Sequence, residues 1–355
     1  MDSRQRVTTV LAGELPDRIP LDDTFWTTTE ERWWREGMPA NVSARDFFAV
    51  NEIVRIDGDY TMQFPERLVR EDTTLREYWD SDGALRQDLH VEDGWTSHWM
   101  DFTIKSMEDW QTHRHRMAFN PTRIRAGTLE TYRRARQEGR FICYMGHATF
   151  HPTWMRIGME NLLMEMLTDP ELIHALFAAH AQLIIDIFEG MWAMGLAFDG
   201  VFLPDDLGYN AGPLISPKLY RNLVFPYHKQ LCDHFAERGL KTILHSDGDI
   251  SLLIPHFIDA GFAGLHPLEV KAGLDLRELY ADYGDRLIFF GNIDARALAG
   301  SHEEIEAEIV DKMTFAREHG RYIYHSDHSV PHSVSFENYG YAIDLIKQLN
   351  GSVRV

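Results

Sequence analysis

Five short apolar runs in the second half of the chain each end in polar or ionisable residues, and this pattern constrains the fold more than any other feature. The runs, with the polar residues that follow them, are 202–204 before Asp205 and Asp206, 242–244 before His245 and Asp247, 263–265 before Glu269, 287–290 before Asn292, and 322–324 before Asp327 and His328. Apolar runs of this length, separated by helical patterns, are typical of buried parallel strands. In a closed barrel of such strands, the residues just beyond each strand meet at one rim, where active sites lie.

The alternation of strand and helix patterns extends over most of the chain. Strand patterns at 141–146 and 198–203 and helical patterns at 159–168 and 170–194 precede the repeats of the second half. Six to eight strand candidates with helices between them favour a (β/α)8 TIM barrel of the α/β class over a doubly wound sheet. We therefore predict one TIM-barrel domain over residues 1–355, with additional helices at its N-terminal end.

Residues 59–104 interrupt this alternation. The segments 67–70, 75–79 and 84–89 alternate polar with apolar residues, and Asp80–Gly83 lies between two of them as a turn signal. Such a pattern is typical of antiparallel hairpins. We predict an antiparallel β excursion that decorates the barrel and could form part of a lid.

Composition excludes several classes of function. The formal net charge of -20 would repel phosphate backbones and anionic lipids, so we expect neither a nucleic-acid nor a membrane partner. Cys143 and Cys232 cannot form a CxxC pair or a four-thiolate zinc site, and two unpaired thiols suit a reducing cytoplasm. Residues 1–6 lead into no apolar signal segment, which also favours a cytoplasmic location. No glycine-rich phosphate loop follows any strand, which argues against nucleotide-dependent chemistry.

The residues at the predicted rim suggest a metal site or an acid–base centre. His245 and Asp247 are two positions apart at a strand end, so both side chains could face the same side. An imidazole and a carboxylate are suitable zinc ligands, and His328, Asp327 or Glu269 could complete the set from another strand. The same side chains could instead hydrogen-bond to one another and hold an organic anion directly. The sequence leaves both possibilities open.

Two further pairs of residues are candidates for the same rim. Successive strand residues face opposite sides, so only one of Asp205 and Asp206 should enter the barrel mouth, where it could act as a general base or hold a protonated nitrogen. The other is expected to cap the helix region that follows. His147 and His151 flank a short segment after an early strand. Either could line the pocket, and a structural hydrogen-bonding role is the alternative.

Aromatic residues near strand and loop ends are candidates for substrate contacts. Trp26, Trp154 and Tyr209 could wall an apolar pocket or hold a quaternary ammonium group by cation–π attraction. Aromatic side chains are more often part of the core. We single out Trp26 and Trp154 because of their positions near strand or loop ends.

Several segments together carry a family resemblance that extends over nearly the whole chain. They are residues 11–20, 167–171, 205–208, 215–220, 226–227, 245–248, 291–294 and 337–338. These segments resemble the uroporphyrinogen decarboxylase superfamily, which includes cobalamin-dependent methyltransferases. True decarboxylases of that superfamily carry an N-terminal arginine-rich segment that holds a tetrapyrrole. Residues 21–26 of this chain contain no arginine, so an octacarboxylate would meet no counter-charge there, and uroporphyrinogen is not the expected substrate.

The resemblance implies a methyltransferase rather than a decarboxylase. Thiol-activating methyltransferases of the superfamily bind zinc through His-x-Cys and a later Cys, and His245, Asp247 and His328 stand at the matching positions of this chain. Nitrogen and oxygen ligands make zinc a harder Lewis acid, which suits polarisation of an ether oxygen or a carboxylate. Within this scheme we expect Asp206, Glu269 and His245 to be catalytic. The expected substrate-binding residues are Trp26, His147, Trp154, Asp205, Tyr209, Asn292 and Asp327.

The resemblance also implies the partners of the reaction. The enzyme would move a methyl group between a small methylated substrate, or tetrahydrofolate, and the cobalt of a corrinoid protein in a demethylation system. No Asp-x-His-x-x-Gly segment occurs in the chain, so the cobalamin would arrive on a separate partner protein. A homodimer is a further expectation.

Two other functions remain open from the sequence. One is a metal-free decarboxylase or lyase of a small organic acid, with Asp206 handling the proton. The other is a non-catalytic protein that binds a corrinoid or a small molecule. The convergent ionisable residues favour an enzyme over the second of these.

Overall fold

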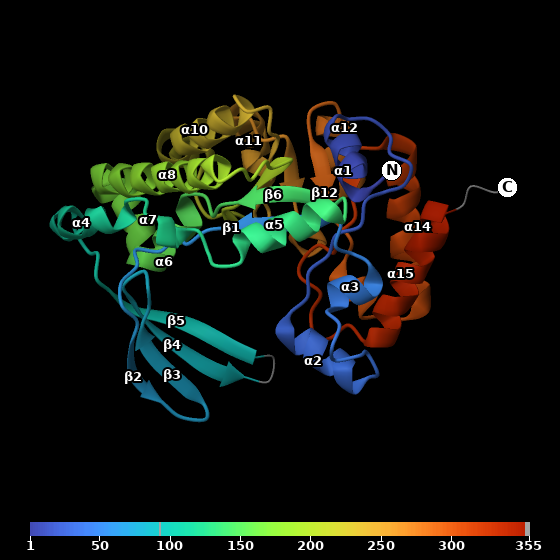
Figure 1. Cartoon of the computed structure of the whole chain (residues 1–355), viewed down its shortest axis with the longest axis horizontal. Helices are drawn as coiled ribbons and strands as arrows, with labels where there is room; N and C mark the ends of the chain where they lie inside the picture. Colours follow the sequence, from blue (N-terminus) through green and yellow to red (C-terminus); the bar gives the residue numbers. More distant parts are fainter. Residues whose placement is uncertain (92–93, 352–355) are drawn as a thin grey trace.

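A curled parallel sheet forms the centre of the protein, for which the computed structural model describes residues 1–91 and 94–351. Its seven strands lie in the order β1-β6-β7-β10-β11-β12-β13 (Figure 1). They are β1 (Ile53–Asp57), β6 (Phe141–Met145), β7 (Gly200–Pro204), β10 (Thr242–His245), β11 (Gly264–His266), β12 (Ile288–Phe290) and β13 (Tyr322–Ile323). This arrangement confirms the predicted α/β class and the parallel pairing. The described residues place seven strands in this sheet, whereas the sequence predicted a barrel of eight.

Residues 21–25 contact both edges of the parallel sheet. Leu21 forms a parallel bridge with Tyr324, next to β13, and Asp22 forms an antiparallel bridge with Asn51, next to β1. The Asp22 side chain adds a contact of its own, because its Oδ1 accepts a hydrogen bond from the Ile53 amide at 3.3 Å. The segment therefore lies between the first and last strands of the sheet.

Helices pack around the sheet (Figure 1). They are α1 (Ser3–Leu11), α2 (Thr27–Arg35), α3 (Ala44–Phe48), α4 (Met107–His113), α5 (Thr128–Gln137), α6 (Phe150–Ile157), α7 (Met159–Thr168), α8 (Pro170–Ala193), α9 (Pro217–Leu219), α10 (Phe225–Ala236), α11 (Ile254–Ala260), α12 (Leu276–Tyr283), α13 (Ala295–Leu298), α14 (His302–His319) and α15 (Phe336–Gly351). Local sequence explains several of their starts. Asp169 caps α8 ahead of Pro170, and Ser301 with Glu304 forms a capping box at α14.

The longest helix is α8. It is the one helix among the described residues that is long and apolar enough to cross a membrane, and 61% of its most apolar window is buried inside the protein. A core helix shows the same composition, so its length alone indicates no membrane span.

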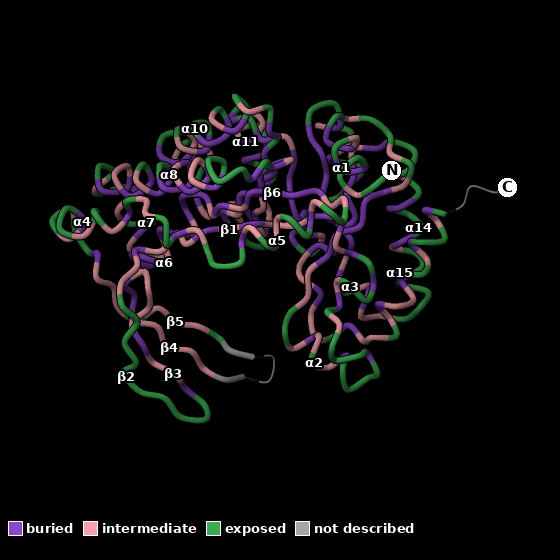
Figure 2. The backbone as a smooth tube through the Cα atoms, in the orientation of Figure 1, coloured by how far each residue is buried: buried purple, intermediate pink, exposed green. Residues whose placement is uncertain are grey.

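A second sheet projects from the body of the protein. It is antiparallel, with β2 (Arg67–Glu71), β3 (Leu75–Trp79), β4 (Ala84–Val91) and β5 (Gly94–Phe102) in that order. The turn between β3 and β4 is held by Asp80 Oδ1, which accepts hydrogen bonds from the amides of Asp82 and Ala84. Every residue of the outer strand β2 is exposed (Figure 2). This sheet lies within the region 59–104 that the sequence singled out as antiparallel.

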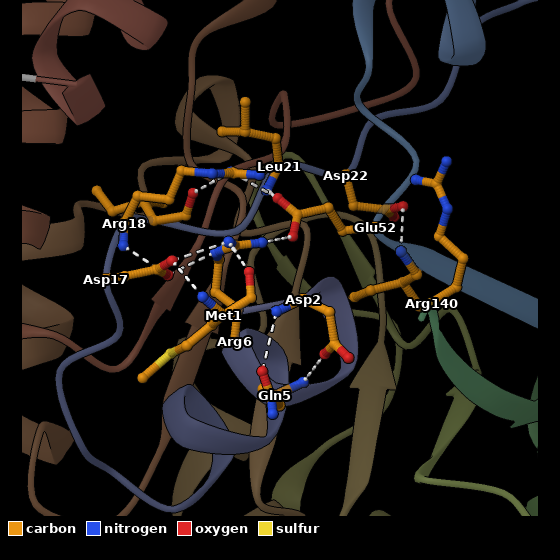
Figure 3. Close-up of polar contacts among 12 residues, drawn as sticks. Met1, Asp2, Gln5, Arg6, Asp17, Arg18, Leu21, Asp22, Glu52 and Arg140 are labelled. Atoms are coloured by element: carbon orange, nitrogen blue, oxygen red, sulfur yellow. Dashed lines mark hydrogen bonds and ion pairs between the residues drawn. The ribbon is translucent and has the colours of Figure 1, made fainter. Parts of the chain in front are cut away.

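Helix α1 packs on the interior of the curled sheet. Val7, Val10 and Leu11 form an apolar cluster with inward-facing residues of the strands, among them Phe202 and Phe290. A buried ion pair fixes the helix, because Arg6 Nη1 lies 2.5 Å from Glu52 Oε2 (Figure 3). Helix α1 therefore fills one end of the interior of the curled sheet. The polar residues lie at the other end, beyond the C-terminal ends of the strands.

Candidate functional site

Five ionisable side chains converge beyond the C-terminal ends of the strands. Asp206 follows β7, His245 and Asp247 end and follow β10, Glu269 follows β11, and His328 follows β13. Their ligand atoms form two groups, Asp206–His245–Asp247 and Asp247–Glu269–His328, and within each group the atoms lie within 4.8 Å of one another. Of the three predicted metal ligands, Asp247 therefore lies beside both His245 and His328, but the two imidazoles fall in different groups.

The spacing of these groups suits a metal ion. His245 Nε2 lies 3.5 Å from Asp206 Oδ1 and 3.7 Å from Asp247 Oδ1, and His328 Nε2 lies 3.6 Å from Asp247 Oδ2. These distances exceed ordinary hydrogen bonds. They are close to about 3.4 Å, the separation of two donor atoms around a tetrahedral zinc with bonds of about 2.0–2.1 Å. The residues present therefore fit zinc or a similar divalent cation.

Asp247 is the least satisfied member of the cluster. Its Oδ1 atom is buried and has no hydrogen-bond partner among the described residues. Burial raises the pKa of this carboxyl, His245 lowers it, and the nearby Asp206 and Glu269 raise it further. A cation beside Asp247 would remove this electrostatic conflict.

His245 is oriented by a second histidine on the neighbouring strand. The Nδ1 atoms of His245 and His266 lie 2.7 Å apart, so one donates a hydrogen bond to the other. Burial and the nearby His325 and His245 lower the pKa of His266 well below its usual value, which keeps its ring neutral. When His245 is the donor, its Nε2 lone pair faces the carboxylates, as a metal ligand requires.

Asp206 belongs to a tight pair with His151 at the start of α6. His151 Nδ1 lies 2.7 Å from Asp206 Oδ2. Burial would raise the pKa of Asp206, but this hydrogen bond and the charges of His245 and His151 hold it well below its usual range. Burial opposes protonation of His151, yet the same bond raises its pKa above the ordinary value. The pair can therefore keep a proton on the imidazole next to an ionised carboxylate.

Glu269 is nearly buried and already has partners. Its Oε2 accepts a hydrogen bond from the Gly248 amide at 3.0 Å, and its Oε1 lies 2.9 Å from Lys271 Nζ. The first contact fixes the carboxylate against the loop that carries Asp247. Lys271 is partly exposed, so its ammonium group can leave without disturbing the core.

Three of the predicted substrate-binding residues have most of their polar atoms engaged within the protein. Asp205 is fully buried, bonds His228 Nε2 at 2.8 Å and accepts the Phe150 and His151 amides at the start of α6. Asn292 bonds the main chain at 268, 274 and 276. Asp327 accepts the amides of 270 and 295. These contacts stabilise the loops around the cluster, and Asp205 caps the earlier helix α6 instead of the one that follows it.

The predicted aromatic residues lie around the cluster at different depths. Trp26 is 51% exposed and stacks on His328 with 5.7 Å between ring centroids. Trp154 lies 5.0 Å from the His151 ring and 4.9 Å from Trp99 of β5, so the antiparallel sheet reaches this side of the site. Tyr209 is 52% exposed on a two-residue strand.

His147 stays uncharged at neutral pH. Burial and the charges of His151 and His245 lower its pKa to about 4. Its ring lies 6.3 Å from that of His151, which places it at the edge of the cluster.

Sequence reasoning did not pair His151 with Asp206, and it did not place His266 in the site. His151 was weighed as a pocket residue because it follows a strand together with His147, but its pairing with Asp206 joins residues 55 positions apart. His266 ends an apolar run in the same way as His245. This shared position could have identified His266 as a site residue.

Comparison with known proteins agrees with this architecture. Residues 148–349, more than half of the chain, match the family model described as uroporphyrinogen decarboxylase (URO-D). The chain belongs to the uroporphyrinogen decarboxylase family. This confirms the resemblance drawn from the sequence motifs. The match begins after β6 and includes all five residues of the cluster.

One solved structure of another protein shares this fold. A methyltransferase from Methanosarcina mazei aligns with a TM-score of 0.65 over 98% of this chain and 99% of its own, at 14% sequence identity. The two proteins therefore share a fold over essentially their whole lengths. Dispersin B aligns over 70% of this chain and 82% of its own, at 11% identity and a TM-score of 0.36, too low to indicate a common fold. No curated protein matches this sequence.

Proposed function

We propose that this family member is a methyltransferase that moves a methyl group between a small methylated compound, or a folate, and the cobalt of a partner corrinoid protein. The observation that carries the proposal is the convergence of His245, Asp247 and His328 with Asp206 and Glu269 at the C-terminal ends of the strands. The fold shared with the Methanosarcina mazei methyltransferase supports the same reaction class. We further infer that residues 21–25 complete the sheet as an eighth strand of a closed barrel, with this cluster at its mouth.

In this proposal His245, Asp247 and His328 hold zinc. Zinc bound there would act as a Lewis acid on the oxygen that loses the methyl group. His266 orients His245 through the 2.7 Å contact between their Nδ1 atoms. The stacked ring of Trp26 limits the movement of His328.

The proton needed by the leaving oxygen comes from the protein. His151 holds a proton at Nδ1 against Asp206 Oδ2, and this pair borders the cluster beside His245. Breaking the bond between methyl carbon and substrate oxygen leaves negative charge on that oxygen, and transfer of the proton from the pair neutralises it. Glu269 is the second candidate for this role.

Two cavities near the cluster could hold a small substrate. One cavity of about 610 Å³ is lined by residues of β5 and by Trp154, whose ring contacts His151, and it includes none of the five cluster residues. Another of about 160 Å³ is lined by Lys271, Asp327 and His328 among others. Aromatic side chains such as Trp154 line the first cavity, and the Lys271 ammonium group lines the second. Together they suit a methylated aromatic compound with an oxygen substituent. The corrinoid partner would dock over the same rim. We expect the reaction to take place in the cytoplasm.

Methyl transfer can be measured directly. Purified protein is mixed with reduced cobalamin, free or on a corrinoid carrier, and with aryl methyl ethers, methylamines or methyltetrahydrofolate. Formation of methylcobalamin and of the demethylated product is expected with at least one donor, and loss of both with His245→Ala. An exposed carboxylate variant, Asp285→Asn, is the matched control, since its side chain is 81% exposed. Absence of transfer from every donor would refute the proposal.

The His151–Asp206 pair favours one alternative, a metal-free decarboxylase or lyase of a small organic acid. A proton held between His151 Nδ1 and Asp206 Oδ2, which lie 2.7 Å apart, is suited to protonating a carbanion without a metal. Release of carbon dioxide from an arylacetate-type acid by the chelator-treated protein would support this alternative and contradict methyl transfer.

A further inference from the structure

The two ligand groups at the rim have one residue in common. Asp206 and His245 belong to one group, Glu269 and His328 belong to the other, and Asp247 belongs to both. Asp247 Oδ1 faces His245 Nε2 at 3.7 Å, and Asp247 Oδ2 faces His328 Nε2 at 3.6 Å. The two imidazoles therefore approach opposite oxygens of a single carboxylate.

We infer that this rim binds two divalent metal ions bridged by Asp247. His245 and Asp206 complete the ligands of the first ion, and His328 and Glu269 complete those of the second. The catalytic role of this two-metal centre rests on the proposed function. The centre would hold two ions where the proposed function has a single zinc. Two-metal sites characteristically use such a shared carboxylate between adjacent ions.

The ligand count supports two sites. Each ion would receive one imidazole, one terminal carboxylate and one oxygen of Asp247, which is the three-ligand set of a catalytic zinc with an open position. All three measured imidazole–carboxylate distances, 3.5, 3.7 and 3.6 Å, are close to the donor separation of about 3.4 Å expected around one tetrahedral ion. None is short enough for a good hydrogen bond.

The position of Asp247 between the two groups also supports two ions. His151 pairs with Asp206 and Lys271 pairs with Glu269, whereas Asp247 Oδ1 is buried without a hydrogen-bond partner in the described part of the chain. A single ion held through Oδ1 would leave His328 facing Oδ2 at a distance that makes no hydrogen bond. Two cations give both oxygens and both imidazoles a partner.

Two ions would narrow the class of substrate. The residues that would hold the first ion lie beside the His151–Asp206 pair, and those that would hold the second include His328, which lines the cavity of about 160 Å³. An oxygen atom bound between or across two ions is stabilised as it gains negative charge. The centre thus favours a methyl donor whose leaving atom is oxygen, such as an aryl ether or an ester, over a methylamine.

Metal stoichiometry tests the inference without reference to activity. The full-length protein is freed of metal with a chelator and titrated with Zn²⁺, and bound metal is measured by mass spectrometry after gel filtration. We expect two ions per chain for the native protein, one for His245→Ala, one for His328→Ala, and a weakening of both sites by at least tenfold for Asp247→Asn. Asp285→Asn should keep two ions.

Two more conservative substitutions test the inference with less risk of misfolding. Asp206→Asn and Glu269→Gln remove one charge from each half and should each weaken one site only, with unchanged circular dichroism. Saturation of the native protein at one ion or none would overturn the inference, as would loss of all binding in either histidine variant. A protein that binds one ion and transfers methyl groups refutes this inference alone. A protein that binds two ions and transfers none refutes the proposed function alone.

Discussion

His245 and His266 face each other across neighbouring strands, with their Nδ1 atoms 2.7 Å apart. His266 makes no contact with the carboxylates of the cluster among its hydrogen bonds and ion pairs in the described residues, yet it determines where the free nitrogen of His245 points. Contacts of this kind commonly change metal affinity by about 10–100-fold when they are removed.

This contact leads to the first prediction. His266→Leu should weaken Zn²⁺ binding by about 10–100-fold, because the Nδ1 atom of His245 loses its partner. His266→Asn should retain most of the affinity, since its amide oxygen can accept the same hydrogen bond. Competition titration with a coloured zinc chelator measures both variants. Equal affinities for His266→Leu and the native protein would show that His245 needs no such support.

The buried ion pair at the opposite end of the sheet gives a prediction about stability. Glu52 bonds Arg6, Arg18 and the Leu21 amide, and its side chain is only 3% exposed (Figure 3). Glu52→Ala should lower the free energy of unfolding by about 1–3 kcal/mol, because it leaves Arg6 Nη1 without this partner while Asp17 still pairs with the guanidinium. Urea unfolding followed by circular dichroism measures the loss.

An exposed pair provides the control for that measurement. Lys229 and Asp233 lie 2.8 Å apart on α10, with side chains about half exposed. Asp233→Asn should change the free energy of unfolding by less than about 1 kcal/mol. A similar small change for Glu52→Ala would mean that the Arg6–Glu52 pair contributes no more than a surface contact.

Buried histidines should make the protein sensitive to mild acid. Burial and the charge of Arg156 lower the pKa of His180, and burial with the nearby His325 and His245 lowers that of His266. Burial also lowers the pKa of His325, against the opposing charge of Asp23. The unfolded chain therefore binds more protons than the folded one as pH falls below about 6.5, and stability decreases. Each such imidazole contributes a slope of up to about 1.4 kcal/mol per pH unit.

His180 is the cleanest position for testing this dependence. Its Nδ1 accepts a hydrogen bond from Arg156 Nη1 and its Nε2 donates to the carbonyl of His147, contacts that a glutamine can largely replace. Unfolding of the metal-free protein at pH 7.5 and 5.5 should show a smaller loss of stability for His180→Gln than for the native chain. The exposed His302→Gln is the control. If His180→Gln lost as much stability between pH 7.5 and 5.5 as the native chain, the claim that His180 is neutral in the folded protein would be contradicted.

Much of the fold could be predicted because it depends on local patterns. Apolar runs with polar ends marked the strands from β7 to β13. The helical pattern at 170–194 marked α8, and the alternating residues of 67–89 marked the antiparallel strands β2 to β4. The packing of α1 on the strand interior was not predictable. It depends on residues such as Val7 and Phe202 meeting across more than half of the chain.

The sequence allowed us to predict which residues form the site, but not which of them contact one another. Position after a strand identified His245, Asp247, Glu269 and His328, since strand ends of a parallel sheet converge. Whether a polar residue faces the cluster or supports a loop depends on side-chain direction. Asn292 follows β12 just as Glu269 follows β11, yet its amide bonds the main chain of residues 268–276. No sequence pattern distinguishes these two outcomes.

Zinc-dependent methyl transfer tests the central claim most directly. Metal-free protein is supplied with increasing Zn²⁺, reduced cobalamin and an aryl methyl ether, and the rate of methylcobalamin formation is recorded. The rate should be at background without zinc, rise as the rim is filled, and remain at background for Asp247→Asn at the same zinc concentrations. A metal-free protein as active as the zinc-loaded one, or an Asp247→Asn variant with the native rate, would contradict the claim that these side chains hold the reactive centre.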